Sequence, residues 1–254
     1  FDADVTLARN GALLRAVFSD SKVKIVLSPK EQTLQMNLEA HGWQPPIGPR
    51  LEFNDLALTA VIDSQRATVT GFEGRLGRGT VKGVAKVSWG GDIRAEGEFS
   101  LTRGELGQLL PMFVNDFSAT GNLDANATYA LRSNTLATLF ANPRVDANFT
   151  AERGVLNNVD IVRGIQQASS RDGVRGGSTK FDVLAGSLQV SANRYSYRQL
   201  RLASGPMSAT GSFDVMPDGE LSGRISAEIG SKSVIVARGT LNLSGTLKTP
   251  VLKP

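Results

Sequence analysis

Residues 92–101 read DIRAEGEFSL, a stretch in which polar and apolar residues alternate. Successive side chains of an extended strand point to opposite faces, so Ile93 and Phe99 would share an apolar face, and Arg94 and Glu96 a polar one. Such alternation is typical of antiparallel sheets with one covered face. Strands of parallel sheets are buried on both faces and read as continuous apolar runs.

The same alternation recurs along much of the chain, in residues 79–89, 117–131, 143–151, 207–215, 219–229 and 235–247. The composition agrees, because 41% of the residues are hydrophobic but only 6% are aromatic, and 27 are glycine. That mixture suits many short strands joined by tight turns. We therefore predict an all-β, mainly antiparallel fold.

Some segments interrupt this pattern. Helical spacing of apolar residues predicts short helices at 104–114 and 155–168, the second capped by Asn157 or Asn158, and a further turn at 134–141. We expect two or three short helices in all. In residues 51–62 the phase slips between Phe53 and Leu56, which predicts a bulge at Asn54–Asp55.

The stretch from Trp43 to Pro49 contains three prolines, which cannot donate ladder hydrogen bonds. We place a boundary there. Residues 1–50 are expected to form N-terminal strands that continue from an upstream part of the protein, and residues 51–254 the main β domain.

A weak repeat of the form polar-Gly-x-apolar runs through the predicted strands. Its glycines are Gly74, Gly97, Gly121, Gly211, Gly223, Gly239 and Gly245, each at an apolar-parity position. Glycine there permits kinks and sharp coiling. We therefore predict a strongly curved or twisted sheet that forms a groove or half-barrel.

Several classes of chemistry lack their residues. The chain has no cysteine and one histidine, His41, which argues against zinc, haem and iron–sulfur sites and against Ser/His/Asp catalysis. No local pair of carboxylates suggests acid–base work. We expect no enzymatic activity, no cofactor and no metal.

The charge pattern does not favour nucleic acid. The net charge is +4, but charges of both signs alternate along the strands, and the aromatic residues share a face with aliphatic ones. A stacking platform for nucleic acid needs aromatic residues interleaved with Lys and Arg.

The sequence contains no run of about 18 apolar residues, the length that could span a bilayer. The chain begins with Phe1 and not Met, so we expect a segment of a longer protein, with any membrane anchor outside it.

A set of motifs resembles the C-terminal region of AsmA-like proteins in order and spacing, over about residues 51–254. The motifs are Phe72–Gly83, Leu139–Pro143, Gly154–Ile161, Gly176–Phe181, Leu200–Leu202, Met207–Gly211 and Gly245–Pro250. The resemblance implies a periplasmic protein of Gram-negative bacteria, attached to the inner membrane and related to TamB and the chorein-type bridge-like lipid carriers. It also implies a curved β groove that conducts phospholipid towards the outer membrane.

The leading hypothesis is a lipid-handling module in which acyl chains lie on the apolar face. The candidate lipid-binding residues are Val81, Val87, Trp89, Ile93, Phe99, Leu123, Phe149, Phe213 and Ile225. Candidate contacts for headgroup phosphates are Arg163, Arg171, Arg175 and Lys180. The alternative is a structural or assembly factor for outer-membrane biogenesis, whose apolar face is a closed protein core and whose partners are envelope proteins. Residue parity alone does not separate the two, because a packed core and a lipid groove show the same alternation.

Overall fold

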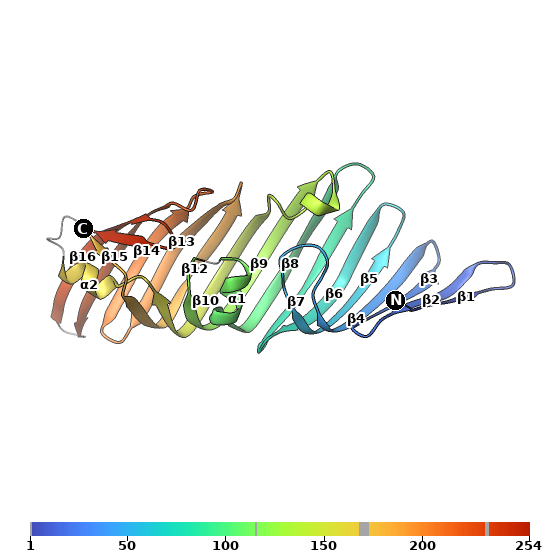
Figure 1. The fold of residues 1–254 in the computed structure, drawn as a ribbon, viewed down its shortest axis with the longest axis horizontal. Coiled ribbons are helices and arrows are strands. Elements are labelled where there is room, and N and C mark those ends of the chain that lie inside the picture. Colours follow the sequence, from blue (N-terminus) through green and yellow to red (C-terminus); the bar gives the residue numbers. More distant parts are fainter. Residues whose placement is uncertain (1, 115, 168–172, 232–233) are drawn as a thin grey trace. The chain divides into compact units, whose positions relative to one another are not determined.

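The computed structural model describes residues 2–114, 116–167, 173–231 and 234–254. It is all-β: seventeen antiparallel strands belong to one sheet that does not close on itself, and helices are few and short (Figure 1). The predicted fold class is therefore confirmed. By backbone contacts the chain divides into two compact units, which we treat separately.

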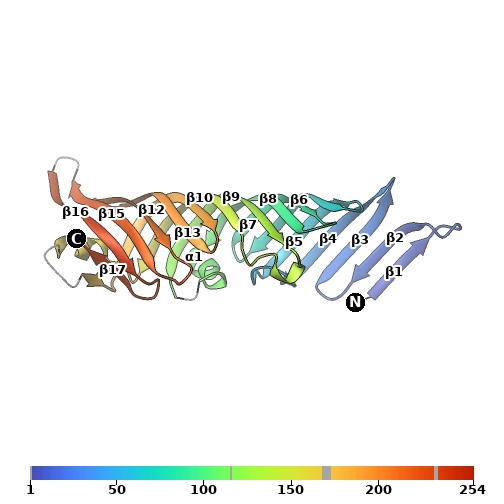
Figure 2. The same ribbon diagram turned by 90° about the horizontal axis from the view of Figure 1, so that it is seen from above.

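Unit 1 comprises residues 1–104 and 127–143. Its strands follow one another as an antiparallel meander, each paired with the next along the chain (Figures 1 and 2). They are β1 (Asp2–Leu7), β2 (Leu13–Ser19), β3 (Val23–Lys30), β4 (Thr33–Trp43), β5 (Phe53–Ile62), β6 (Arg66–Leu76), β7 (Gly79–Ser88) and β8 (Ile93–Glu105), whose last residue falls in unit 2. The proline-rich segment lies between β4 and β5, which pair with each other, so it joins two neighbouring strands within unit 1.

Unit 2 comprises residues 105–126 and 144–254. Strand β9 (Ala119–Ser133) gives its first part to unit 2 and its remainder to unit 1. The other strands are β10 (Arg144–Asn157), β11 (Val174–Arg175), β12 (Ser178–Ser191), β13 (Arg194–Ser204), β14 (Met207–Val215), β15 (Leu221–Ser231), β16 (Val234–Gly245) and β17 (Pro250–Lys253). Strand β10 pairs with β12, and pairing then follows chain order from β12 to β17.

The helices are shorter than the sequence predicted. Helix α1 (Leu106–Leu109) continues into a 3-10 turn at Leu110–Met112, and a second 3-10 turn spans Leu136–Thr138. Helix α2 covers only Ile161–Gln166, because β10 extends to Asn157. Asp160, not Asn157 or Asn158, caps it by accepting a hydrogen bond from the backbone N–H of Arg163. No helix in the described ranges is long and apolar enough to cross a membrane.

The expected bulge at Asn54–Asp55 is wrong. The register offset between β4 and β5 is the same at His41–Asp55 and at Trp43–Phe53. The backbone distortion lies across the ladder in β4, where Gly42 has a φ of +53°. The register shift in this part of the sheet falls instead between β5 and β6, at Thr59–Ala60.

The sheet of unit 2 is strongly curved. Only Gly176 and Gly177 separate β11 from β12, yet β11 pairs with β17, five strands further on. Five strand spacings of a flat sheet would cover about 24 Å, whereas the short link and one pairing distance allow only about 15 Å. The two glycines have φ values of +69° and +80°, a left-handed conformation that few other residues adopt. Unit 2 is therefore a half-barrel, consistent with the predicted curvature.

Candidate functional site

The antiparallel register of unit 1 aligns apolar residues into four cross-strand rows on one face of the sheet. We call these rows the open apolar face. Row 1 is Val23, Ala40, Leu56, Gly74, Val81 and Leu101; row 2 is Phe18, Ile25, Leu38, Leu58, Phe72, Gly83 and Phe99; row 3 is Ala16, Leu27, Met36, Ala60, Val69, Ala85 and Gly97; row 4 is Leu34, Ile62, Ala67, Val87 and Ala95. No charged residue belongs to any row.

Burial differs between row 1 and the other rows of this face. Every residue of row 1 is buried, and the ring of Phe53 lies over Gly74 there. At the other margin Leu139, from the segment after β9, packs in a cluster with Ala95 and Val87 of row 4. All residues of row 2 and most of row 3 are only half-buried. Most of row 4 is half-buried as well, so the described part of unit 1 leaves an accessible apolar strip beside one buried margin, row 1.

At two glycines of the middle rows, an aromatic ring from a neighbouring strand lies where a side chain would be. The ring of Phe72 lies over Gly83, and that of Tyr129 lies over Gly97. Tyr129 also meets Phe99, with ring centroids 6.3 Å apart, and its burial raises the pKa of its hydroxyl. These rings fill the gaps that missing side chains would leave, so the strip has an apolar floor.

The structure places the candidate residues of unit 1 as follows. Val81 is buried in row 1, while Val87 and Phe99 are half-buried in rows 4 and 2. Ile93 packs at the margin against the cluster that contains Leu139. Trp89 lies just beyond β7, 38% exposed, and its indole N–H donates to the Ser64 carbonyl at 2.9 Å, so it lies outside the rows.

In unit 2 the corresponding apolar parity packs against a helix. Gly164 of α2 sits directly against Leu241, where an added Cβ would be 2.7 Å from the leucine methyl. Ile165 lies 3.5 Å from the Cβ position of Gly239. Ile161 and Ile165 of the helix belong to a buried cluster that includes Phe181. This part of unit 2 is therefore a packed protein core.

The candidate residues of unit 2 lie in or beside this core. Leu123, Phe213 and Ile225 are partly buried against it. Phe149 meets Tyr197 edge-on at 6.4 Å, and Tyr197 stacks on Phe213 at 4.5 Å. Burial, with a smaller contribution from Tyr195, raises the pKa of Tyr197 to about 12.

The basic candidates do not form a described cluster. Arg163 on α2, Arg175 on β11 and Lys180 on β12 are all exposed, on three different elements. Arg175 faces Val251 in the β11–β17 ladder, and Lys180 is paired with a residue of β10. Arg171 lies outside the described residues.

Comparison with known proteins adds no family to this geometry. No family model matches the chain, and no curated protein or solved structure matches it.

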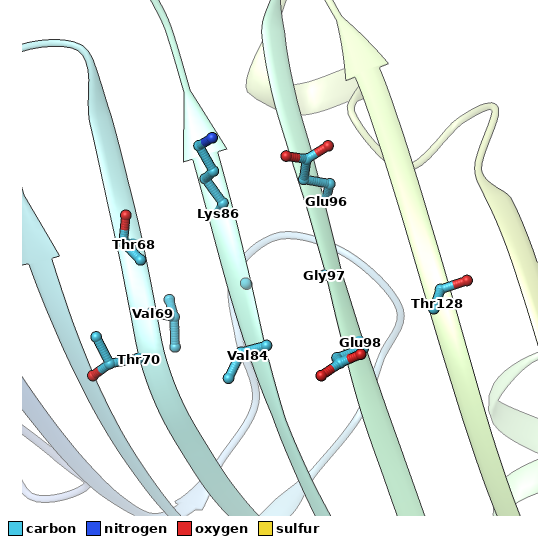
Figure 3. Close-up of a pocket in the computed structure, with 10 residues that line it drawn as sticks. Thr68, Val69, Thr70, Val84, Lys86, Glu96, Gly97, Glu98 and Thr128 are labelled. Atoms are coloured by element: carbon cyan, nitrogen blue, oxygen red, sulfur yellow. The ribbon is translucent and has the colours of Figure 1, made fainter.

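A hollow of about 480 Å³ lies on the other face of unit 1, over β6 to β9 (Figure 3). Thr68, Lys86 and Glu96, which line it, form one cross-strand row of polar parity. The opposite charges of Lys86 and Glu96 suit that direct pairing. Val69, Ala85 and Gly97 of row 3 line the hollow too, so its lining is not confined to residues of polar parity.

The polar face of unit 2 carries a network around Asp214. Its carboxylate accepts hydrogen bonds from Arg194 and Arg198, both at 2.7 Å, and from the Ser196 hydroxyl at 2.6 Å. Burial alone would raise the pKa of Asp214, but these hydrogen bonds outweigh it and hold the pKa below its ordinary value. Arg198 also donates to the carbonyls of Tyr197 and Phe213, so the network ties β13 to β14 beside their register shift.

His41 is the one histidine of the sequence, and it forms a cross-strand pair. His41 is an exposed strand residue whose Nδ1 lies 2.8 Å from Asp55, its cross-strand partner. Among the residues that the structure describes, no group of three or more His, Asp or Glu could hold a metal ion.

Sequence reasoning missed the contribution of β2 to β5 to the site. Phe18, Ile25, Leu38 and Leu58 are as much part of row 2 as Phe99 is. The signal was present, since Leu34, Met36 and Leu38 alternate with polar residues.

Proposed function

We propose that this chain is a lipid-handling module of the cell envelope, which binds phospholipid acyl chains on the open apolar face of unit 1 and conducts them between inner and outer membrane. The single observation that carries the proposal is the half-buried state of row 2. A row in the middle of a packed core would be buried, as row 1 is.

The dimensions of the strip suit an acyl chain. Row 2 crosses β2 to β8, and six strand spacings amount to about 29 Å. The hydrocarbon core of a bilayer is about 30 Å thick, so one acyl chain needs about half of that length. The strip is therefore long enough for one chain in several positions along it.

The binding energy would come from burial alone. Each methylene removed from water is worth about 0.8 kcal/mol, and no particular residue is required for that gain. Because every residue of row 2 is apolar, an acyl chain that slides from one strand to the next loses little binding free energy. Headgroups would stay in water at the margins of the face, and transfer would involve no chemical step.

The alternative, a structural or assembly factor with a closed apolar core, has its support in unit 2. There α2 packs against Leu241 and Gly239 and contributes to a buried cluster. Under this alternative, envelope proteins recognise unit 2 as a folded body. Under the leading proposal, unit 1 binds lipid.

The location is part of the proposal. The resemblance to AsmA-like proteins supports a periplasmic site in a Gram-negative bacterium, with attachment to the inner membrane through a segment that is not in this sequence. Phospholipid is the proposed ligand, and envelope proteins are the further partners.

A fluorophore placed on either face of one strand tests the proposal. The chain has no cysteine, so Leu58→Cys and Val61→Cys each give a single labelling site on β5. Leu58 belongs to row 2, whereas Val61 is 37% exposed on the opposite face. We expect short-chain phosphatidylglycerol, below its critical micelle concentration, to shift the emission of the label at position 58 to shorter wavelength and to leave that at 61 unchanged. No shift at 58, or equal shifts at both positions, would contradict the proposal.

A further inference from the structure

The connection between β4 and β5, residues 44–52, leaves the ladder and curves over the sheet (Figure 1). We call it the strap. Its tip, Gly48, meets the ring of Phe140, three atoms of which lie between 3.0 and 3.3 Å from the position that a Cβ of Gly48 would take. Phe140 directly follows Leu139, which packs on Ala95 of row 4. Because the strap starts at the other end of the strands, beyond row 1, the contact joins segments from opposite margins of the apolar face.

The reach of the strap places this contact above the middle rows. Residues 48 and 53 are five positions apart, so Gly48 lies at most about 17 Å from Phe53. Five positions along β5 lead from Phe53 to Leu58 of row 2, a comparable distance. The strap thus reaches about as far as row 2, and Phe140 extends towards it from row 4. The contact therefore lies above the accessible apolar strip and not at its edge.

The strap crosses the strip without sealing it. Leu58, Phe72 and Phe99 of row 2 stay half-buried. A segment packed directly on these side chains would bury them, as the ring of Phe53 helps to bury Gly74 in row 1. The apolar surface below the strap is therefore still accessible in part.

Large apolar side chains remain exposed where the two segments meet. Ile47 is 44% exposed and Phe140 is 41% exposed, whereas the neighbouring Leu139 is 3% exposed. Leu139 packs, and packing explains its residue type. Ile47 and Phe140 instead add exposed apolar surface beside an apolar strip, and apolar surface gathered in this way is typical of a binding site.

The strap has a preset shape but few bonds. Pro45, Pro46 and Pro49 fix their φ angles and keep the arm extended, and Gly48 takes a φ of +95° at the tip. Among the described residues, the one hydrogen bond of the strap runs from the Leu51 N–H to the Pro49 carbonyl, within the strap itself. The strap can therefore move away from the sheet and return without breaking a hydrogen bond to it.

We infer that the strap holds a phospholipid acyl chain against the strip, with Ile47 and Phe140 as binding residues on the side away from the sheet. An acyl chain on an uncovered strip loses water on one side only. A cover removes its other side from water as well, and each methylene that is covered in this way strengthens binding. The inference rests on the proposed function, since it names further residues of the same site.

A label on the strap tests the inference. The full chain is labelled at Ile47→Cys with an environment-sensitive fluorophore, and short-chain phosphatidylglycerol below its critical micelle concentration is the probe. Val61→Cys on β5 is the matched control, because Val61 is 37% exposed and lies outside the apolar rows. We expect the lipid to shift the emission at position 47 to shorter wavelength, and brominated acyl chains to quench it, with neither effect at position 61.

The outcomes separate this inference from the proposed function. If the label at Leu58 responds to the lipid and the label at Ile47 does not, the inference is overturned and the proposed function stands. No response at Leu58 would contradict the proposed function, and the inference with it. Equal responses at 47 and 61 would overturn the inference. So would a shift at 47 that appears without lipid as the protein concentration rises, which would indicate a second copy of the chain.

A side-chain variant gives an independent measurement through the label at Leu58. Phe140→Ser removes the ring that covers the chain and meets Gly48, and it should weaken binding of the same lipid about tenfold. The control Leu136→Ser changes a residue of the same connection that is 52% exposed, and it should bind like the unmodified chain. Circular dichroism confirms that both variants are folded. Unchanged affinity of a folded Phe140→Ser variant would overturn the inference, and if that variant unfolds, the label at Ile47 decides.

Discussion

Tyr197 of β13 stacks on Phe213 of β14, with ring centroids 4.5 Å apart and planes 20° from parallel. Phe149 of β10 meets the same tyrosine edge-on. Offset stacks and edge contacts of this kind are the arrangements that aromatic quadrupoles favour. A residue singled out as a lipid contact, Phe213, therefore also has a packing role within unit 2.

Burial of Tyr197 makes the folded chain lose stability as the pH rises through the alkaline range. Its pKa is about 12 in the folded chain, against about 10 when unfolded. Folding disfavours the ionised form of Tyr197. Its contribution to the free energy of unfolding is therefore present below about pH 10 and is lost as the pH rises towards 12. Urea unfolding should show that Tyr197→Phe removes about 3 kcal/mol of the alkaline decline. The control Tyr195→Phe, at a residue that is 38% exposed, should keep most of it, since Tyr195 is only the smaller cause of the shift. An unchanged decline in the first variant would disprove the assignment.

The network around Asp214 acts at the opposite end of the pH scale. Because its pKa is held below the ordinary value, its contribution is present above about pH 4 and is lost as the pH falls further. Asp214→Asn should cost about 2 kcal/mol at neutral pH, since hydrogen bonds to charged groups are worth about that much. Chemical unfolding at a series of pH values measures both effects. The control is Asp146→Asn, an exposed position on β10, where a comparable loss would contradict the special role of Asp214.

Gly97 is required by close approach. A Cβ there would overlap the Val84 carbonyl oxygen and lie 2.7 Å from the Tyr129 hydroxyl. We expect Gly97→Ala to lower the free energy of unfolding by about 1–3 kcal/mol. Gly71→Ala, on β6 two strands away, meets nothing within 4 Å and should change stability by less than about 0.5 kcal/mol. Similar losses in the two variants, measured by thermal or urea unfolding, would show that the Tyr129 contact does not decide the residue at 97.

Much of the fold could be predicted from residue parity. Alternation at 207–215 placed β14 to the residue, because one-sided burial of a strand gives its sequence a period of two. Alternation at 92–101 placed the start of β8 but not its end, which lies at Glu105 inside the predicted helix. The end of β10 could not be placed, because Val155 and Leu156 fit a helical stripe as well as a strand. Their pairing with β12 decides the matter, and that pairing is not local in sequence.

The candidate site was harder to predict than the fold. Parity assigned Val87 and Phe99 to an apolar face, but whether a residue there is buried depends on what lies above it. The covering residues, Leu139 in unit 1 and Ile165 in unit 2, come from segments distant in sequence. Asp214 and its arginine partners were missed for a similar reason, since only the β13–β14 register brings them together.

Phospholipid is proposed to bind to the open apolar face of unit 1. Mass spectrometry of lipid that co-purifies with the full chain tests it most directly, with Leu38→Gln/Leu58→Gln on row 2 as the variant and Val61→Gln/Val84→Gln as the control. Val61 and Val84 are 37% and 38% exposed, and both have polar-face parity. Circular dichroism and unfolding midpoints confirm that each protein is folded. If the variant unfolds, the same contact is measured by crosslinking of lipid to a photoreactive residue at position 38, with position 61 as the control.

We predict that the unmodified chain and the control carry phospholipid, and that the row 2 variant carries about tenfold less or lower still. A folded, unmodified chain that purifies free of phospholipid, or a row 2 variant that retains as much lipid as the control, would contradict the account.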